Sequence, residues 1–176
     1  MATRTRGDPP GGRWDPHTGP DGTKSERWVW DAPGAATAPL RASEHDEQCA
    51  LIEICRLHEG RHPALRNLFA VPNGGHRHKA VAAGLAASGV VAGVPDLFLA
   101  HLGRFPEPAY LHGRCEYPGL FIELKRVGYA PSDVKLLQHE WHDRLRAAGY
   151  AVAVCGGWEQ AWAGIRSYLG IAEHVR

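Results

Sequence analysis

Apolar residues recur along the chain at two different periods, and the period of each segment predicts its element. Between residues 43 and 60 they recur at helical spacing, with Ser43 as an N-cap and Gly60 as a stop. Short apolar runs bounded by turn residues instead predict strands. In chain order we predict helix 43–60, strand 65–71, helix 76–88, strands 95–100 and 120–127, helix 132–149, strand 150–155 and helix 158–170.

This order predicts an α/β fold in which a mixed β-sheet is flanked by helices. The strand 150–155, YAVAVC, is apolar at nearly every position and follows the helix 132–149. That pattern is typical of a parallel strand that is buried on both faces and reached through a helical crossover. The segment between 101 and 119 is rich in turn residues and is expected to be a loop.

Residues 1–42 have a different composition from the rest of the chain. They are rich in proline and glycine and contain few aliphatic side chains, so they cannot bury enough surface to offset the entropy of ordering. We therefore expect a flexible N-terminal extension, residues 1–42, before one domain, residues 43–176. For the tryptophan-bearing segment 27–31, RWVWD, packing against the domain itself is favoured over contact with a partner or nucleic acid.

Composition limits the class of protein without naming an activity. The chain has 176 residues, 44% hydrophobic and 22% charged, which is typical of one globular domain. No apolar run has the length of a membrane helix and the N-terminus lacks the apolar segment of a signal peptide, so we expect a cytoplasmic protein. The net charge of +1 neither requires nor excludes a nucleic-acid partner. The cysteines form no CxxC pair, which argues against a disulfide or zinc scaffold.

Charged residues stand within two of the predicted strands, where an uncompensated charge is costly. Asp96 lies at the start of strand 95–100, and Glu123 and Lys125 lie two residues apart in strand 120–127. Because side chains alternate along a strand, Glu123 and Lys125 share the face opposite the leucine and isoleucine side chains, which we expect to form core. Asp96, at a neighbouring strand start, can meet them.

Two carboxylates beside a lysine suit the metal-assisted hydrolysis of a phosphodiester. A hard divalent cation held by Asp96 and Glu123 would lower the pKa of water and neutralise developing charge. Lys125 would position the attacking water or help to deprotonate it. The alternative is a turn acid beside an exposed salt bridge of Glu123 and Lys125, which contributes little to stability. From spacing alone the two interpretations have equal weight.

A second polar block follows the strand 65–71. Asn73, Gly74 and Gly75 form a turn with an amide and free backbone N–H groups, and Arg77 and Lys79 stand at the start of the helix 76–88. Anions bind well at such helix starts because the helix dipole is positive there. We interpret the block as a phosphate-contacting loop, and the alternative is a plain turn with solvated cations.

The motifs resemble a known nuclease family. "VPD" followed by "IELK" resembles the PD-(D/E)XK nuclease pattern, with Pro95, Asp96, Glu123 and Lys125 in the positions of that pattern. The ordered blocks "EHDEQ", "VPNGG", "GVVAGVPDLFLA", "GLFIELKR" and "GYAVAV", with a glutamine and a tryptophan in the helix 132–149, resemble the virus-type replication-repair nuclease domain, VRR-NUC. The resemblance covers residues 43–169.

The resemblance implies a restriction-endonuclease-like fold with an αβββαβ core. It also implies a deoxyribonuclease that depends on Mg²⁺ or Mn²⁺ and acts on branched, flap or junction DNA in replication or repair, in a phage or its bacterial host. Asp96 and Glu123 would be metal ligands, the carbonyl of Leu124 a further ligand, and Lys125 the catalytic lysine. Arg126, which follows the motif, is a candidate contact to DNA.

The resemblance also implies roles for one residue in each of the two helices that flank the motif. Gln138 matches the glutamine that often accompanies it, and would orient the water or touch the DNA backbone. The first-helix metal ligand is either Glu44, which has the spacing of the family from Gln48, or Glu47, which lies on the inward face of the helix. Both glutamates stay open.

The rest of the helix 132–149 is interpreted from its pattern. We expect Ser132 to cap it, Leu137 to be core, and His139 and His142 to face solvent or the rim of the site. Two further functions are kept beside a deoxyribonuclease: a nucleic-acid-binding or assembly module without turnover, and a nuclease that acts on RNA. Cutting both strands of a symmetric junction would require two sites, which makes a homodimer attractive.

Overall fold

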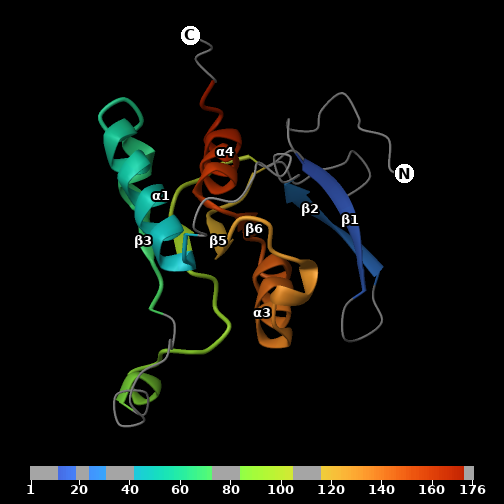
Figure 1. Cartoon of the computed structure of the whole chain (residues 1–176). Helices are drawn as coiled ribbons and strands as arrows, with labels where there is room; N and C mark the ends of the chain where they lie inside the picture. Colours follow the sequence, from blue (N-terminus) through green and yellow to red (C-terminus); the bar gives the residue numbers. More distant parts are fainter. Residues whose placement is uncertain (1–11, 19–23, 31–41, 73–83, 105–115, 173–176) are drawn as a thin grey trace.

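A four-stranded β-sheet forms the centre of the molecule (Figure 1). The structure, a computed structural model, describes residues 12–18, 24–30, 42–72, 84–104 and 116–172, and for the first two of these segments it describes the backbone. The strands are β3 Leu68–Ala70, β4 Leu97–Leu99, β5 Leu120–Lys125 and β6 Ala151–Gly156, and they are hydrogen-bonded in the order β3-β4-β5-β6.

The sheet is mixed, as predicted. β3 and β5 both run antiparallel to β4, whereas β6 runs parallel to β5. The parallel pair is connected through the helix α3, Leu136–Ala147. β6 has five of its six residues buried, which confirms a strand covered on both faces. The predicted α/β fold with a mixed sheet and flanking helices is therefore confirmed.

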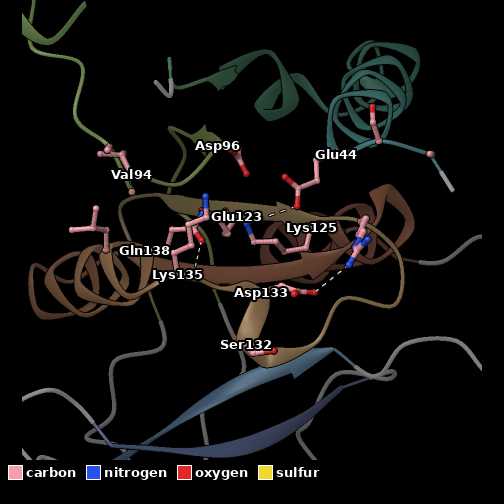
Figure 2. A pocket seen from close by; sticks show the side chains of 15 residues that line it. Glu44, Val94, Asp96, Glu123, Lys125, Ser132, Asp133, Lys135 and Gln138 are labelled. Carbon is pink, nitrogen blue, oxygen red and sulfur yellow. Dashed lines mark hydrogen bonds and ion pairs between the residues drawn. The ribbon is translucent and has the colours of Figure 1, made fainter. Parts of the chain in front are cut away.

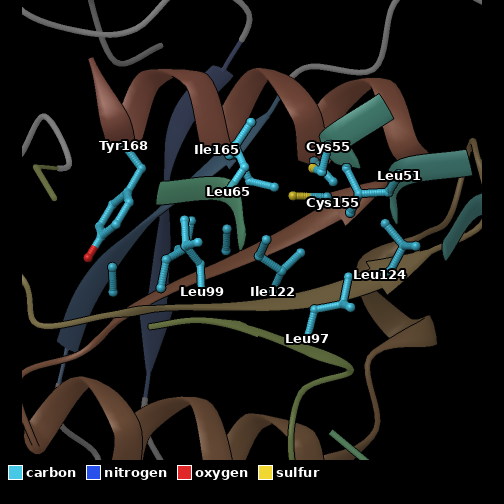
Figure 3. Packing of buried hydrophobic residues seen from close by; sticks show 14 of the residues in the cluster. Leu51, Cys55, Leu65, Leu97, Leu99, Ile122, Leu124, Cys155, Ile165 and Tyr168 are labelled. Carbon is cyan, nitrogen blue, oxygen red and sulfur yellow. The ribbon is translucent and has the colours of Figure 1, made fainter. Parts of the chain in front are cut away.

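Helices cover both faces of the sheet. α1, Glu44–His58, and α4, Trp158–Leu169, pack against each other and against β5 (Figure 1). Leu120, Ile122 and Leu124 of β5 are at most 1% exposed and belong to one core cluster with residues of α1 and α4. Figure 3 shows Ile122 and Leu124 on that side of the sheet. The predicted core face of β5 is therefore confirmed. The opposite face of β5, which carries Glu123, is covered by α3.

α1 begins and ends where the sequence predicts. The backbone N–H of Ser43 donates to Asp46 Oδ2 at 2.9 Å, and the Asp46 N–H donates back to Ser43 Oγ at 3.2 Å. This reciprocal pair satisfies two backbone donors that a helix start otherwise leaves open. The helix ends at His58, with Glu59 as its C-cap, just before Gly60.

α3 begins later than the sequence suggests. Instead of a helix capped by Ser132, residues Pro131–Asp133 form a short 3₁₀ turn. The Ala130 N–H donates to Asp133 Oδ2 at 2.9 Å, which closes this turn separately from the helix. α3 then starts after Lys135, whose N–H donates to Gln138 Oε1 at 2.9 Å. Ser132 therefore lies outside the helix, and Leu136 and Gln138 belong to its first turn.

The N-terminal 42 residues contain two strands that we did not predict. β1, Gly12–Thr18, and β2, Lys24–Trp30, pair antiparallel with Trp14 opposite Trp28, and β2 lies beside β6 (Figure 1). Aromatic and β-branched residues such as those at 28–30 favour strands. Our prediction used the composition of the whole segment 1–42 and therefore missed the two strands. The flexibility of the remaining extension and the boundary at residue 42 stay predictions.

Two predicted segments are described only in part. Of the helix 76–88, the structure describes its last residues, and residues 84–87 are helical. Of the loop 101–119, residues 105–115 lie outside the described residues, and its two ends meet through a bridge between Gly103 and Tyr117. In the parts of the chain that the structure describes, no helix is both long and apolar enough to cross a membrane.

Candidate functional site

A cleft of about 940 Å³ opens beside the end of β5 that faces α1 and α3. Three carboxylates from three elements line it: Glu44 at the start of α1, Asp96 just before β4, and Glu123 in β5 (Figure 2). Lys125 lies among them. The other lining residues are Ala42, Ser43, Ala92, Gly93, Val94, Arg126, Ser132, Asp133, Lys135, Leu137 and Gln138.

Strand register brings Asp96 to β5. Leu97 pairs with Ile122 in antiparallel register, so Asp96 falls beside the next part of β5. Its Oδ2 accepts a hydrogen bond from the Leu124 N–H at 2.9 Å. The N–H and C=O of one strand residue point to the same side of the strand. The Leu124 carbonyl is therefore directed to the side of β5 on which Asp96 lies. The Asp96 carboxylate and the Leu124 carbonyl oxygen, both predicted as metal ligands, therefore lie on the same side of β5.

Glu123 is a buried carboxylate with a buried cation beside it. Its side chain is 1% exposed, and Oε1 accepts from Lys125 Nζ at 2.7 Å and from Gln138 Nε2. Burial raises the pKa of Glu123, and the charge of Lys125 opposes that rise. Lys125 is only 7% exposed, so the exposed salt bridge considered from the sequence is not what forms.

The donor types in the cleft suit a hard divalent cation. Carboxylate and carbonyl oxygens are the ligands that Mg²⁺ and Mn²⁺ prefer. The carboxylates of Asp96 and Glu123 are each engaged by a donor of β5, and no group of three or more His, Cys, Asp or Glu side chains among the described residues is arranged to hold an ion. The residue types therefore fit a metal, while their positions show no preformed coordination sphere.

The two glutamates left open in α1 have different surroundings. Glu44 is exposed, lines the cleft, and places Oε1 3.9 Å from Lys125 Nζ. Glu47 is 5% exposed and accepts a hydrogen bond at 2.9 Å from the N–H of Trp158, the first residue of α4. A carboxylate there satisfies one open donor and the positive end of the helix dipole. Of the two glutamates, Glu44 therefore lies in the cleft, whereas Glu47 is engaged within the fold.

Gln138 connects the start of α3 to Glu123. Its oxygen caps the helix at the Lys135 N–H, and its amide nitrogen donates to Glu123 Oε1. Leu137 beside it is 53% exposed and lines the cleft, so our expectation of a core residue was wrong. Leu137 lies in the first turn of α3, where its backbone carbonyl packs against the loop residue Gly93: a Cβ at Gly93 would stand 2.8 Å from the Leu137 carbonyl oxygen.

The predicted DNA contacts are described only in part. Arg126 lines the cleft with a half-exposed side chain, and its guanidinium lies 3.8 Å from Asp133 Oδ2. The contacts predicted in the turn after β3 lie outside the described residues and stay predictions. They are Asn73, Gly74, Gly75, Arg77 and Lys79.

His142 is the residue of the site that sequence reasoning missed. We expected it to face solvent or the rim, but it is 1% exposed and its Nε2 lies 3.8 Å from Glu123 Oε2. Its spacing from Gln138 was the available signal, because residues four apart lie on one face of a helix. Once Gln138 is placed against Glu123, His142 follows on the same face.

The fold is shared with a protein of known structure. No family model and no curated protein matches the chain. Among solved structures, a chain described as "VRR_NUC domain protein" matches with a TM-score of 0.55 and 24% sequence identity, over 75% of this chain and 92% of that one. At this identity the likeness concerns the fold. The chain therefore has the restriction-endonuclease-like fold of a VRR_NUC domain protein, in agreement with the resemblance seen in its sequence.

Proposed function

We propose that the chain is a divalent-metal-dependent nuclease of the VRR-NUC type that hydrolyses DNA phosphodiester bonds. The observation that carries the proposal is the cleft in which Asp96, the residue before β4, meets Glu123 and Lys125 of β5. The fold shared with a VRR_NUC domain protein supports it. The residue types are those that phosphodiester hydrolysis needs, a set of oxygen donors beside a cation.

Each residue has a role in this mechanism. Bound Mg²⁺ or Mn²⁺ would supply an activated water and neutralise charge on the phosphate. Asp96, Glu123 and the Leu124 carbonyl would hold the ion, with Glu44 as the ligand from the first helix. Lys125, fixed by its buried contact with Glu123, would position the attacking water and help to deprotonate it. Positioning by a rigid strand is worth much of the rate in such reactions.

The cleft holds cations as well as carboxylates: Lys125, Arg126 and Lys135 stand among four acidic side chains. Lys135 and Arg126 line it together with the acidic residues, so cations stand beside the reacting centre although the whole chain is nearly neutral. Cations so placed hold phosphates on either side of the scissile bond. We propose branched, flap or junction DNA as the substrate, in replication or repair, and a homodimer where two strands are cut.

A second function is favoured by one observation. Lys125 and Gln138 both hold Glu123 Oε1, and Asp96 accepts from a backbone N–H, so the carboxylates are engaged within the protein. A chain that kept these contacts would bind nucleic acid without turnover. This binding or assembly module is the alternative to the nuclease.

Cleavage assays separate the two functions. The substrates are end-labelled linear, nicked, flap and four-way DNA and a matched RNA, each with Mg²⁺, Mn²⁺ or EDTA, and Glu123→Gln is the control variant. We expect the wild type to cut at least one DNA with metal and none with EDTA, and the variant to cut none. Binding without cutting under all conditions would favour the module, and cutting of the RNA alone would change the substrate class.

The two glutamates of α1 are expected to have separate roles. Glu44→Gln should lower cleavage at least about tenfold without changing the free energy of unfolding, since Glu44 is exposed and faces Lys125. Glu47→Ala should lower the free energy of unfolding by about 2 kcal/mol, because the Trp158 N–H loses its acceptor. Urea unfolding and cleavage rates measure both effects. Glu47→Gln, which keeps an oxygen acceptor, is the matched control, and a cleavage loss there equal to that of Glu44→Gln would reverse the assignment.

A further inference from the structure

α3 presents two polar side chains to the buried carboxylate of Glu123. Gln138 lies in the first turn of the helix, and His142 lies one turn later on the same face. Gln138 Nε2 donates to Glu123 Oε1, whereas His142 Nε2 faces Oε2 at 3.8 Å. The two oxygens of one carboxylate therefore have different neighbours from the same helix.

The two oxygens of Glu123 also differ in what lies around them. Lys125 and Gln138, which both donate to Oε1, line the cleft, so Oε1 is the oxygen on the side of the cleft. Oε2 is buried and has no hydrogen-bond donor among the described residues. His142, which faces it, is 1% exposed and does not line the cleft. Oε2 therefore points to the interior side, towards α3.

A buried carboxylate oxygen without a donor is unfavourable. Its lost solvation costs about 1–3 kcal/mol unless a hydrogen bond replaces it. A separation of 3.8 Å is longer than a hydrogen bond, and a movement of about 1 Å would bring Nε2 and Oε2 to bonding distance. With a proton on Nε2, the imidazole is the group best placed to donate to Oε2, because it is already buried against it.

We propose that His142 is a positioning residue for Glu123. Its Nε2–H holds Oε2 on the interior side, which keeps Oε1 directed to the cleft where a metal ion would be bound. His142 acts through Glu123 and touches neither substrate nor ion. The inference rests on the proposed function, since it assigns Glu123 to a metal. Residues behind metal ligands commonly tune affinity in this way.

The test uses the whole chain and Mn²⁺, whose binding is followed by the electron paramagnetic resonance signal of the free ion. His142→Phe keeps a ring of similar size without a donor and is expected to weaken Mn²⁺ binding about tenfold. The same variant should lower kcat about tenfold and leave KM for DNA unchanged, because the DNA-facing residues are untouched. His142→Gln, which can place an amide N–H near the position of Nε2, should recover most of both losses.

Two further variants separate positioning from plain stability. Leu145→Ala removes packing from the same helix at a residue that is 9% exposed, and should lower thermal stability while Mn²⁺ affinity stays that of the wild type. His142→Asn, whose amide reaches only the Nδ1 position, replaces the phenylalanine variant where that one fails to fold. If folded His142→Phe or His142→Asn binds Mn²⁺ with wild-type affinity, the inference about His142 is wrong, but the proposed function is unaffected. A wild-type chain that neither binds Mn²⁺ nor cuts DNA would overturn the proposed function with it.

Discussion

Lys125→Met is expected to lower the rate of DNA cleavage by about 10³-fold and to destabilise the fold at the same time. The rate falls because the cation beside the attacking water is lost, and such groups contribute about 10²–10⁴-fold. Stability falls because Glu123, 1% exposed, loses the ammonium group 2.7 Å from its Oε1. Leaving one member of a buried ion pair without its partner costs about 3–5 kcal/mol. Urea unfolding and single-turnover cleavage measure the two effects.

A double variant separates the chemical effect from the structural one. Glu123→Gln combined with Lys125→Met removes both charges, so the free energy of unfolding should return to within about 1–2 kcal/mol of the wild type. Cleavage should stay lost. Arg126→Met, at the next position with a half-exposed side chain, is the matched control and should unfold like the wild type. Folded Lys125→Met that cuts DNA at the wild-type rate would contradict the mechanism.

The central part of the fold could be predicted because local and long-range signals agree there. In β5, alternation alone separates the core side chains from Glu123 and Lys125, and in the structure the leucines and isoleucine join the core cluster whereas Glu123 meets Gln138 of α3. The capping pair of Ser43 and Asp46 lies within one turn, so it could be expected without knowing what α1 packs against. Asp96 could be placed near Glu123 because it starts a predicted strand next to the one that carries Glu123, and the antiparallel register of β4 and β5 then brings the two together.

The remaining features depend on which of several competing local contacts forms, and the sequence alone does not show this. Whether α3 begins after Ser132 or Lys135 depends on two side-chain caps, Asp133 for the 3₁₀ turn and Gln138 for the helix, and each is adequate alone. Which face of α3 lies on the sheet then decides that Leu137 is exposed and His142 is buried. A buried histidine is favourable only next to a polar group such as Glu123, a tertiary contact that periodicity cannot reveal.

Asp96→Asn is expected to lower the rate of metal-dependent cleavage by about 10³-fold, while the fold is kept. The amide is close in shape to the carboxylate and retains an oxygen that can accept from the Leu124 N–H, which Asp96 Oδ2 does at 2.9 Å. Removing the charge weakens a hard-cation site, and metal stabilisation worth several kcal/mol corresponds to this loss of rate. Cleavage rates and Mn²⁺ titrations on the same protein sample measure both.

Asp133→Asn is the matched control for Asp96→Asn. Asp133 also lines the cleft and also accepts a backbone N–H at 2.9 Å, from Ala130, so the exchange removes the same charge and keeps the same kind of hydrogen bond. Because Asp133 stands in the turn before α3, beside Arg126, its charge should matter little for catalysis. Equal losses in the two variants would mean that the negative potential of the cleft, and not ligation at Asp96, supports cleavage. If Asp96 is a metal ligand, cleavage should be lost only in Asp96→Asn, and the same variant should bind Mn²⁺ more weakly.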